Sequence, residues 1–287
     1  MNTVLVTGAT GQVGKRFVPR LLQWTANGET VRVLVRDAPR GEQFAALGAD
    51  VVVGDLREEA DRARALDGAS AVVNVAAAFR DVPDAEAWAV NRDAAVALAR
   101  QALAAGVSRF VQTSTNLVYG AGRGRPAQEV DEPCPGEDRG VYPASKAQAD
   151  AALEVLRTTQ GLPLVTVRLA FVYGEGDPHL AQALRFAAGW AAHQRMPMVH
   201  HADVAQALWR ALRVPGVEGR IFHAADDAPV TAFDLYRLAG VPLPDGAADR
   251  QDPDPWRGVS DNLPLRDDLG WRPVYPSVWT ARDAGAL

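Results

Sequence analysis

The chain has 287 residues, of which 48% are hydrophobic and 23% charged, and this composition is typical of a globular protein in water. The formal net charge of −5 offers no basic field, and no apolar run is long enough to span a bilayer. We therefore expect neither a nucleic-acid partner nor a membrane partner. The single cysteine, Cys134, cannot form an internal disulfide, which favours a cytoplasmic location.

Short β-branched runs alternate with longer alanine-rich segments in the first part of the chain. The predicted strands are 3–7, 31–36, 50–53, 71–75, 109–113 and 164–169. The predicted helices are 11–24, 57–66, 85–105 and 142–160. This alternation predicts an α/β fold with a Rossmann-like, doubly wound parallel sheet.

The pattern changes after Gly174, where helices are predicted at 180–190, 202–212 and 231–239, with a short strand at 220–223. We expect residues 1–172, completed by 200–223, to form a dinucleotide-binding Rossmann domain. Residues 173–199 and 224–287 are then expected to form a small, discontinuous substrate-binding cap.

Three glycines, Gly8, Gly11 and Gly14, lie between the first predicted strand and the first predicted helix. Glycines allow a tight turn and a close approach to a pyrophosphate, which the N–H groups at the helix start can bind. The alternative is that they serve only helix–strand packing. The expected cofactor-binding residues of this loop are Gly8, Thr10, Gly11, Gln12, Val13 and Gly14.

The end of the second strand selects between NAD and NADP, because an acid there binds the ribose hydroxyls and an arginine suits a 2′-phosphate. Val35 takes the place expected for the acid and Arg36 follows it, which favours NADP. Asp37 keeps NAD open as the alternative. Beyond the next two strands, Asp55 with Leu56 and Ala76 with Ala77 extend the predicted cofactor site by position.

Tyr142 and Lys146 lie four residues apart, so their side chains share one face of a helix. An ammonium beside a phenol favours the phenolate, so we expect Lys146 to lower the pKa of Tyr142 from its usual value of about 10. A tyrosine tuned in this way exchanges protons with an alcohol or ketone near neutral pH.

The order of these motifs resembles the extended short-chain dehydrogenase/reductase family, also called the NAD-dependent epimerase/dehydratase family. The motifs are the glycine loop, Asp55-Leu56, 74–77, 113–120, Tyr142-x-x-x-Lys146, 168–174 and 200–205, with a last match at 269–273. The resemblance implies a homodimer, and the alanine-rich segments 85–105 and 142–160 could form its four-helix interface.

The resemblance also implies roles for single residues. Tyr142 is similar to the catalytic acid/base, Lys146 to the residue that holds the nicotinamide ribose, and Thr115 to the hydroxyl that orients the substrate carbonyl. Tyr142 and Lys146 are also expected to belong to the cofactor-binding residues. Ser114 is the neighbouring candidate, and a simple backbone hydrogen bond at a strand end is the alternative role for Thr115. We assign Thr115, Asn116 and Phe171 to substrate binding.

The chain departs from the family pattern at Phe171, where members that handle nucleotide sugars often have Asn. The segment between Gly174 and His200 also looks short for a nucleotide-binding loop, although Arg185 and Arg195 stay as candidate anion partners. We therefore expect an NAD(P)-dependent oxidoreductase acting on a carbonyl or alcohol substrate. The alternatives are a nucleotide-sugar epimerase or dehydratase and, less favoured, a module that binds NADP without turnover.

Three histidines, His193, His200 and His201, have a spacing that fits no standard metal-ligand motif. No metal site is expected.

Overall fold

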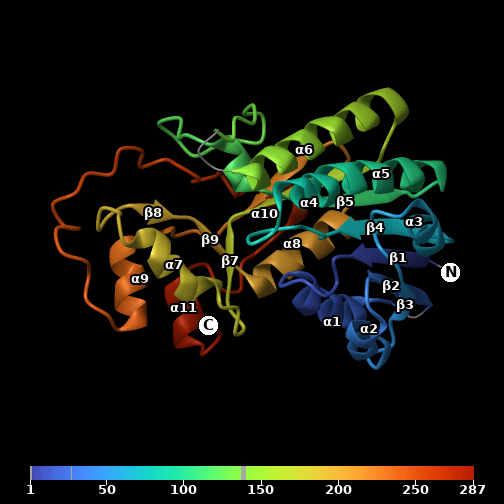
Figure 1. Ribbon diagram of the computed structural model, residues 1–287, viewed down its shortest axis with the longest axis horizontal. Helices are drawn as coiled ribbons and strands as arrows, with labels where there is room; N and C mark the ends of the chain where they lie inside the picture. The colour runs from blue at the N-terminus through green and yellow to red at the C-terminus, as the bar shows by residue number, and fades with distance from the viewer. Residues whose placement is uncertain (1, 27, 137–139) are drawn as a thin grey trace.

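The computed structural model describes residues 2–26, 28–136 and 140–287, and a seven-stranded parallel sheet lies at its centre (Figure 1). The strand order is β10–β6–β5–β4–β1–β2–β3. Their bounds are β1 (Asn2–Thr7), β2 (Glu29–Val35), β3 (Asp50–Val53), β4 (Ala69–Asn74), β5 (Arg109–Thr115), β6 (Leu164–Leu169) and β10 (Ile221–Ala224). The order reverses between β1 and β4, and a crevice forms at the carboxyl ends of such strands. The predicted fold class is confirmed.

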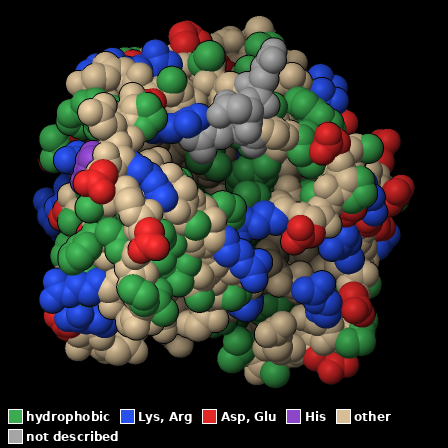
Figure 2. All heavy atoms as spheres, turned by 60° about the vertical axis from the view of Figure 1, so that its left-hand side comes forward, with side chains coloured by type: hydrophobic (Ala, Val, Ile, Leu, Met, Phe, Trp, Pro, Cys, Tyr) green, Lys and Arg blue, Asp and Glu red, His purple; other side chains and the backbone are tan. Residues whose placement is uncertain are grey.

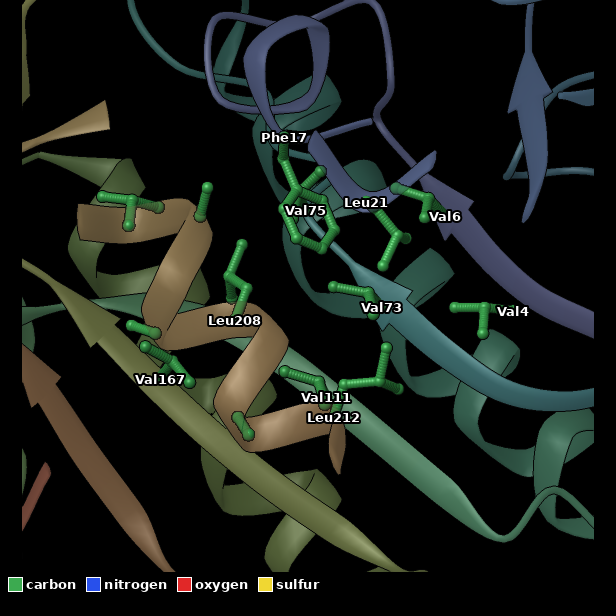
Figure 3. Packing of buried hydrophobic residues seen from close by; sticks show 14 of the residues in the cluster. Val4, Val6, Phe17, Leu21, Val73, Val75, Val111, Val167, Leu208 and Leu212 are labelled. Atoms are coloured by element: carbon green, nitrogen blue, oxygen red, sulfur yellow. The ribbon is translucent and has the colours of Figure 1, made fainter. Parts of the chain in front are cut away.

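Helices cover both faces of the sheet (Figure 1). One face packs against α1 (Gly14–Trp24), α2 (Ala38–Ala45) and α8 (His201–Arg213), and the other against α3 (Glu59–Leu66), α5 (Ala95–Ala104) and α6 (Val141–Gln160). Alternation along β1 separates the two faces, because Val4 and Val6 lie in one apolar cluster with Phe17 of α1 (Figure 3). Leu5 belongs to the cluster on the opposite face. Strands buried on both faces explain the nearly continuous apolar runs of the sequence.

Several helical segments differ from the sequence prediction, which did not include the helices at 38–45, 263–269 and 278–283. Helix α2 was missed because it is short and contains Pro39 and Gly41, which are typical of turns. Gly41 has a packing reason, since a Cβ there would lie 2.7 Å from Val51 Cγ1. The helix predicted at 85–105 is α4 (Asp84–Trp88), then a π-helical turn η1 (Ala89–Ala94), then α5.

A smaller group of elements surrounds the buried Tyr173 at the left of Figure 1. Its helices are α7 (His179–Ala187), α9 (Ala232–Ala239) and α11 (Val278–Asp283). Its strands pair as β7 (Phe171–Tyr173) with β9 (Met198–His200) and β8 (Arg195–Met196) with β11 (Val230–Thr231). This group has its own apolar cluster, although the division of the chain into domains stays a prediction.

The segment that contains α10 (Leu263–Leu269) returns to the main sheet rather than to this smaller group. Leu265, Leu269 and Trp271 are buried in the same cluster as α1 and α8, and the Trp271 indole donates to the Asp203 carbonyl at 3.0 Å. Asp203 also accepts from the backbone N–H groups of Val274 and Tyr275.

Among the helices that the structure describes, none is both long and apolar enough to cross a bilayer.

Replacing Trp271 by Ala should lower the free energy of unfolding by about 3–5 kcal/mol, because it empties a buried site and leaves a hydrogen bond unmade. Trp24, which is 39% exposed, is the matched control, and Trp24→Ala should cost about 1 kcal/mol. Urea unfolding of both variants measures the difference. Equal losses would show that Trp271 does not hold this segment to the sheet.

Candidate functional site

A cleft of about 1120 Å³ opens at the carboxyl edge of the sheet. Its walls come from the glycine loop after β1, the ends of β2, β4 and β5, the start of α6, and residues of β7, α7 and β8. Figure 2 shows a hollow with apolar side chains in its depth and Lys or Arg side chains around it. Ligand sites commonly have volumes of about 300–1,000 Å³, so this cleft has room for a dinucleotide and a small second molecule.

Glycine occurs at the three positions of the loop for different structural reasons. Gly8 has a φ of 70°, and a Cβ there would lie 2.5 Å from the Ala76 Cα. A Cβ at Gly14 would overlap the Gly8 carbonyl oxygen, so these two positions are required by packing. Gly11 is exposed, and its Cβ would meet only that same oxygen, at 3.3 Å. A side chain at Gly11 would therefore take up space in the cleft. Glycine at this position leaves room for a ligand to approach the backbone closely. Thr10, Gln12 and Val13 complete this wall.

The end of β2 brings arginines to the cleft. Val35 is buried, while Arg36 lines the cleft and lies 4.0 Å from the Glu86 carboxylate. Arg40, in the first turn of α2, also lines the cleft and was not singled out from the sequence. Asp37 precedes α2 and is not among the lining residues that the structure describes. The local geometry therefore presents positive charge to a ligand here.

The walls beyond β3 and β4 contain the other expected cofactor residues. Leu56, Ala76 and Ala77 line the cleft, as does Asp55. The Arg57 guanidinium contacts both oxygens of Asp55, with its two contacts to Oδ2 at 3.1 and 2.6 Å, and holds the pKa of that carboxyl below its usual range. Asp55 therefore faces the cleft as a carboxylate that is already paired.

Thr115 and Ser114 end β5 with different hydrogen bonds. The Ser114 hydroxyl donates to Asp150 Oδ2 at 2.8 Å. The Thr115 hydroxyl oxygen accepts from the Leu117 N–H at 3.2 Å and caps the 3₁₀ turn η2 (Asn116–Tyr119), which leaves its proton for another acceptor. The backbone role considered for Thr115 is thus present, and it coexists with a hydroxyl on the cleft wall.

Tyr142 and Lys146 both line the cleft from the first turns of α6. The expected lowering of the Tyr142 pKa is wrong for the protein alone, because burial raises the pKa of Tyr142 to about 12. Arg80 opposes this rise, while Asp150 adds to it. Burial also lowers the pKa of Lys146 to about 8. Among the described residues, Lys146 finds no hydrogen-bond partner, so its ammonium is available to a ligand.

A buried polar network lies behind this pair. Arg168 contacts Asp150 Oδ2 at 3.1 Å and donates to the Tyr119 hydroxyl at 2.6 Å. The Tyr119 oxygen lies 2.6 Å from His223 Nε2, and burial lowers the pKa of His223 to about 4. The Tyr119 hydroxyl is therefore held in this buried network, and Tyr119 is not among the cleft-lining residues that the structure describes.

The residues expected to bind substrate lie at the end of β5, in η2 and in β7. Asn116 lines the cleft and donates to the Ser260 hydroxyl at 2.6 Å, while Phe171 lines it beside His179. Sequence reasoning missed Phe79 and Arg80. The Phe79 ring lies 4.4 Å from the Tyr142 ring. Their position just after the small residues that end the fourth strand was the available signal.

Asn91 supports that segment from inside η1. Its side chain is fully buried, accepts from the Ala78 N–H at 2.8 Å and donates to the Ala78 carbonyl at 2.9 Å. It also donates to the Ser145 hydroxyl at 3.1 Å. Asn91 thus joins the start of α6 to the chain that leads into Phe79.

Two of the three histidines named from the sequence, His200 and His201, make structural contacts. His200 caps α8 by accepting from the Ala202 N–H, and His201 Nε2 lies 2.7 Å from Asp177 Oδ2. In the part of the chain that the structure describes, no three His, Cys, Asp or Glu side chains group as metal ligands.

The chain matches a family model described as the NAD dependent epimerase/dehydratase family over residues 4–225. It is 32% identical over 239 residues to the 4-hydroxy-2-methyl-3-oxo-4-farnesyl-3,4-dihydroquinoline-1-oxide ketoreductase of Stigmatella aurantiaca, with 78% of this chain and 68% of that protein covered. It is 26% identical over 258 residues to the UDP-glucose 4-epimerase of Vibrio cholerae, with 84% and 76% covered.

Solved structures show the same fold. A short-chain dehydrogenase/reductase superfamily protein from Agrobacterium tumefaciens with bound NAD has a TM-score of 0.80 at 23% identity, with 99% of this chain and 96% of that chain covered. The UDP-glucose 4-epimerase of Thermus thermophilus in complex with NAD has a TM-score of 0.73 at 27% identity, with 95% and 94% covered.

Lys146→Met should raise the melting temperature of the cofactor-free protein at pH 7, because it removes a buried ammonium that has no hydrogen-bond partner among the described residues. The folded pKa of about 8 lies below the unfolded one, so the unfolded state binds more protons between about pH 8 and 10. The free energy of unfolding of the wild type should therefore rise with pH across this window.

The exposed Lys15 provides the control, and Lys15→Met should leave both the melting temperature and its pH dependence unchanged. Thermal melts of the three proteins between pH 7 and 10 make the comparison. A destabilised Lys146→Met variant would mean that the ammonium has a stabilising partner.

Proposed function

Because the chain belongs to the NAD dependent epimerase/dehydratase family and is therefore an enzyme of the extended short-chain dehydrogenase/reductase type, we propose that it is an oxidoreductase acting on a carbonyl or alcohol substrate. The observation that carries the proposal is that Thr115, Tyr142 and Lys146 all line the same cleft. A phenol, a hydroxyl and an ammonium together supply proton transfer and oxyanion stabilisation.

A nicotinamide dinucleotide, when bound, supplies or accepts the hydride. The Thr115 hydroxyl proton, which the Leu117 contact leaves available, orients the substrate oxygen. Tyr142 gives its proton to that oxygen during reduction and takes it back during oxidation. Lys146⁺ stabilises the phenolate left behind, which compensates for the burial that raises the pKa of Tyr142.

The residues around the cleft fit a dinucleotide. Gly11 leaves room for close backbone approach, the start of α1 supplies N–H groups for a pyrophosphate, and Lys146 is free to hold ribose hydroxyls. We propose NADP as the preferred form, with NAD as the alternative, because Arg36 and Arg40 both reach the cleft whereas Asp37 does not line it. Arginine suits a 2′-phosphate.

We propose an apolar carbonyl substrate rather than a nucleotide sugar. Phe79 and Phe171 line the part of the cleft near Tyr142, so a sugar would meet aromatic rings there rather than an amide. The Stigmatella aurantiaca relative, a ketoreductase of a farnesylated quinoline compound by its name, acts on a molecule of this apolar kind.

Tyr142→Phe should lower turnover by about 10²–10⁴-fold, since it removes only the hydroxyl that exchanges the proton. Its affinity for the dinucleotide should stay within about twofold of the wild type, because the ring remains in place. The measurement is dinucleotide oxidation with a panel of aromatic and aliphatic ketones, beside fluorescence titration of the cofactor. A Phe variant with wild-type turnover would contradict the assignment.

Replacing Arg36 and Arg40 together by Ala should weaken NADPH binding roughly 10–100-fold and leave NADH binding unchanged, because charge-assisted hydrogen bonds to a 2′-phosphate are lost. Asp37→Asn is the matched control at the same turn and should change neither affinity. Titration of nicotinamide fluorescence gives both constants. If Asp37→Asn weakens NADH instead, the chain prefers NAD.

A nucleotide-sugar epimerase or dehydratase remains the second candidate, supported by the similarity to UDP-glucose 4-epimerases. Such an enzyme regenerates its cofactor within each cycle, so it would retain dinucleotide through purification and gain thermal stability from UDP. A non-catalytic NADP-binding module is the weakest reading, because it has no use for Tyr142 and Lys146.

We further propose a cytoplasmic homodimer. The exposed side of α6, with Val155 57% exposed, and the adjoining helices α4 and α5 are the surface offered to a second copy. Light scattering of the purified protein tests the assembly.

A further inference from the structure

Arg80 lies in an aromatic box at the substrate end of the cleft. Its guanidinium carbon lies 4.6 Å from the centre of the Phe79 ring, 5.2 Å from that of Phe186 and 5.7 Å from that of Phe171. Rings stacked near the faces of a guanidinium leave its in-plane N–H groups as the directions for hydrogen bonding.

The charge of Arg80 forms no ion pair with the described residues. Its one hydrogen-bond acceptor in that part of the chain is Gln182 Oε1, at 2.8 Å from Nη1, and no described carboxylate lies within ion-pair distance. The nearby Asp177 is already used, because its oxygens accept from His179 and His201. A half-buried cation without a paired carboxylate favours an anionic ligand.

The backbone holds Arg80 in this place at an energetic cost. Arg80 and Asp81 have φ values of 55° and 51°, which place two successive non-glycine residues in the left-handed region. Such strain persists where surrounding contacts enforce it, and it gathers at ligand sites. Asn91 supplies one of these contacts by binding both backbone groups of Ala78.

We propose that Arg80 is a specificity-determining residue that binds a carboxylate of the substrate, and that the substrate is an aromatic or similarly flat apolar carbonyl compound with a carboxylate near the reacting carbonyl. The inference rests on the proposed oxidoreductase function, because it names the substrate class of the same cleft. Phe79 contacts both Arg80 and Tyr142, so a molecule bound to Arg80 lies beside the proposed acid/base.

The same guanidinium chemistry would suit a phosphate of the dinucleotide. Its surroundings favour the substrate: Phe171 belongs to β7, whereas Gln182 and Phe186 belong to α7, and neither element carries the glycine loop. The experiment must nevertheless separate the two sources.

The test uses 2-naphthoate and the neutral 2-naphthamide as probes of the same shape, bound to the full-length protein saturated with dinucleotide. Isothermal titration calorimetry should give at least tenfold tighter binding of the carboxylate. Arg80→Met should remove this preference and leave dinucleotide affinity within twofold. Arg80→Lys keeps the charge but loses the planar pair of N–H donors, so it should retain part of the preference.

Arg282→Met is the matched control, because Arg282 also lies over a ring, at 4.5 Å from that of Trp279, but outside the cleft. It should keep the full preference for naphthoate. Equal binding of the two probes to the wild type, no binding of either, or an unchanged preference in Arg80→Met would overturn the proposal. A parallel loss of dinucleotide affinity in Arg80→Met would assign Arg80 to the cofactor and overturn it as well.

Because binding is measured without turnover, the result is independent of the redox assignment. Carboxylate selectivity without ketone reduction would retain the anion site and reject the oxidoreductase. Reduction of neutral ketones without carboxylate selectivity would support the oxidoreductase and reject the anion site. A ketone panel that includes phenylglyoxylate and its methyl ester then tests the anion site and the reduction together. We expect the kcat/KM for the acid to be at least tenfold higher than that for the ester.

Discussion

The contact between Gly8 and Ala76 determines how the carboxyl ends of β1 and β4 are arranged. A Cβ at Gly8 would lie 2.5 Å from the Ala76 Cα, so only glycine lets the two segments approach this closely. A hydrogen-bond chain continues along the same edge, from Thr7 to the Asn74 side chain at 2.5 Å and from Asn74 to Gln112 at 2.7 Å. Three strand ends are thereby held in register, and the cleft opens above them.

The electrostatics of the cleft work against the folded state. Lys146 is 1% exposed, and burial moves the pKa values of Lys146 and Tyr142 in the directions that disfavour their charged forms. Asp150, whose charge favours the ammonium of Lys146, already pairs with Arg168, so the carboxylate that could best offset Lys146 is bound to another cation. Neither group has a side-chain hydrogen-bond partner among the described residues, so a ligand that supplies partners stabilises the folded state.

The parts of the fold that depend on local pattern could be predicted from the sequence. The parallel strands are continuous apolar runs. The four-residue spacing of Tyr142 and Lys146 places their side chains on the same face of any helix. The proximity of Arg80 to Phe171 and Phe186 could not be predicted, because it needs a left-handed turn and residues about a hundred positions away. Nor could the pKa of Tyr142 be predicted from Lys146 alone, because burial raises it and Arg80, not Lys146, is the cation that opposes the rise.

The π-helical turn η1 has a consequence for how relatives of this chain should be compared. A π turn is equivalent to one extra residue inserted in an α-helix, and each residue turns the helix by about 100°. Without that insertion, the position of Asn91 would rotate away from Ala78, although α5 could still pack on the sheet through the same apolar face. Relatives with a one-residue deletion between Ala89 and Ala94 should therefore lack this amide contact, and the gap marks a local difference in helix geometry rather than a change in fold.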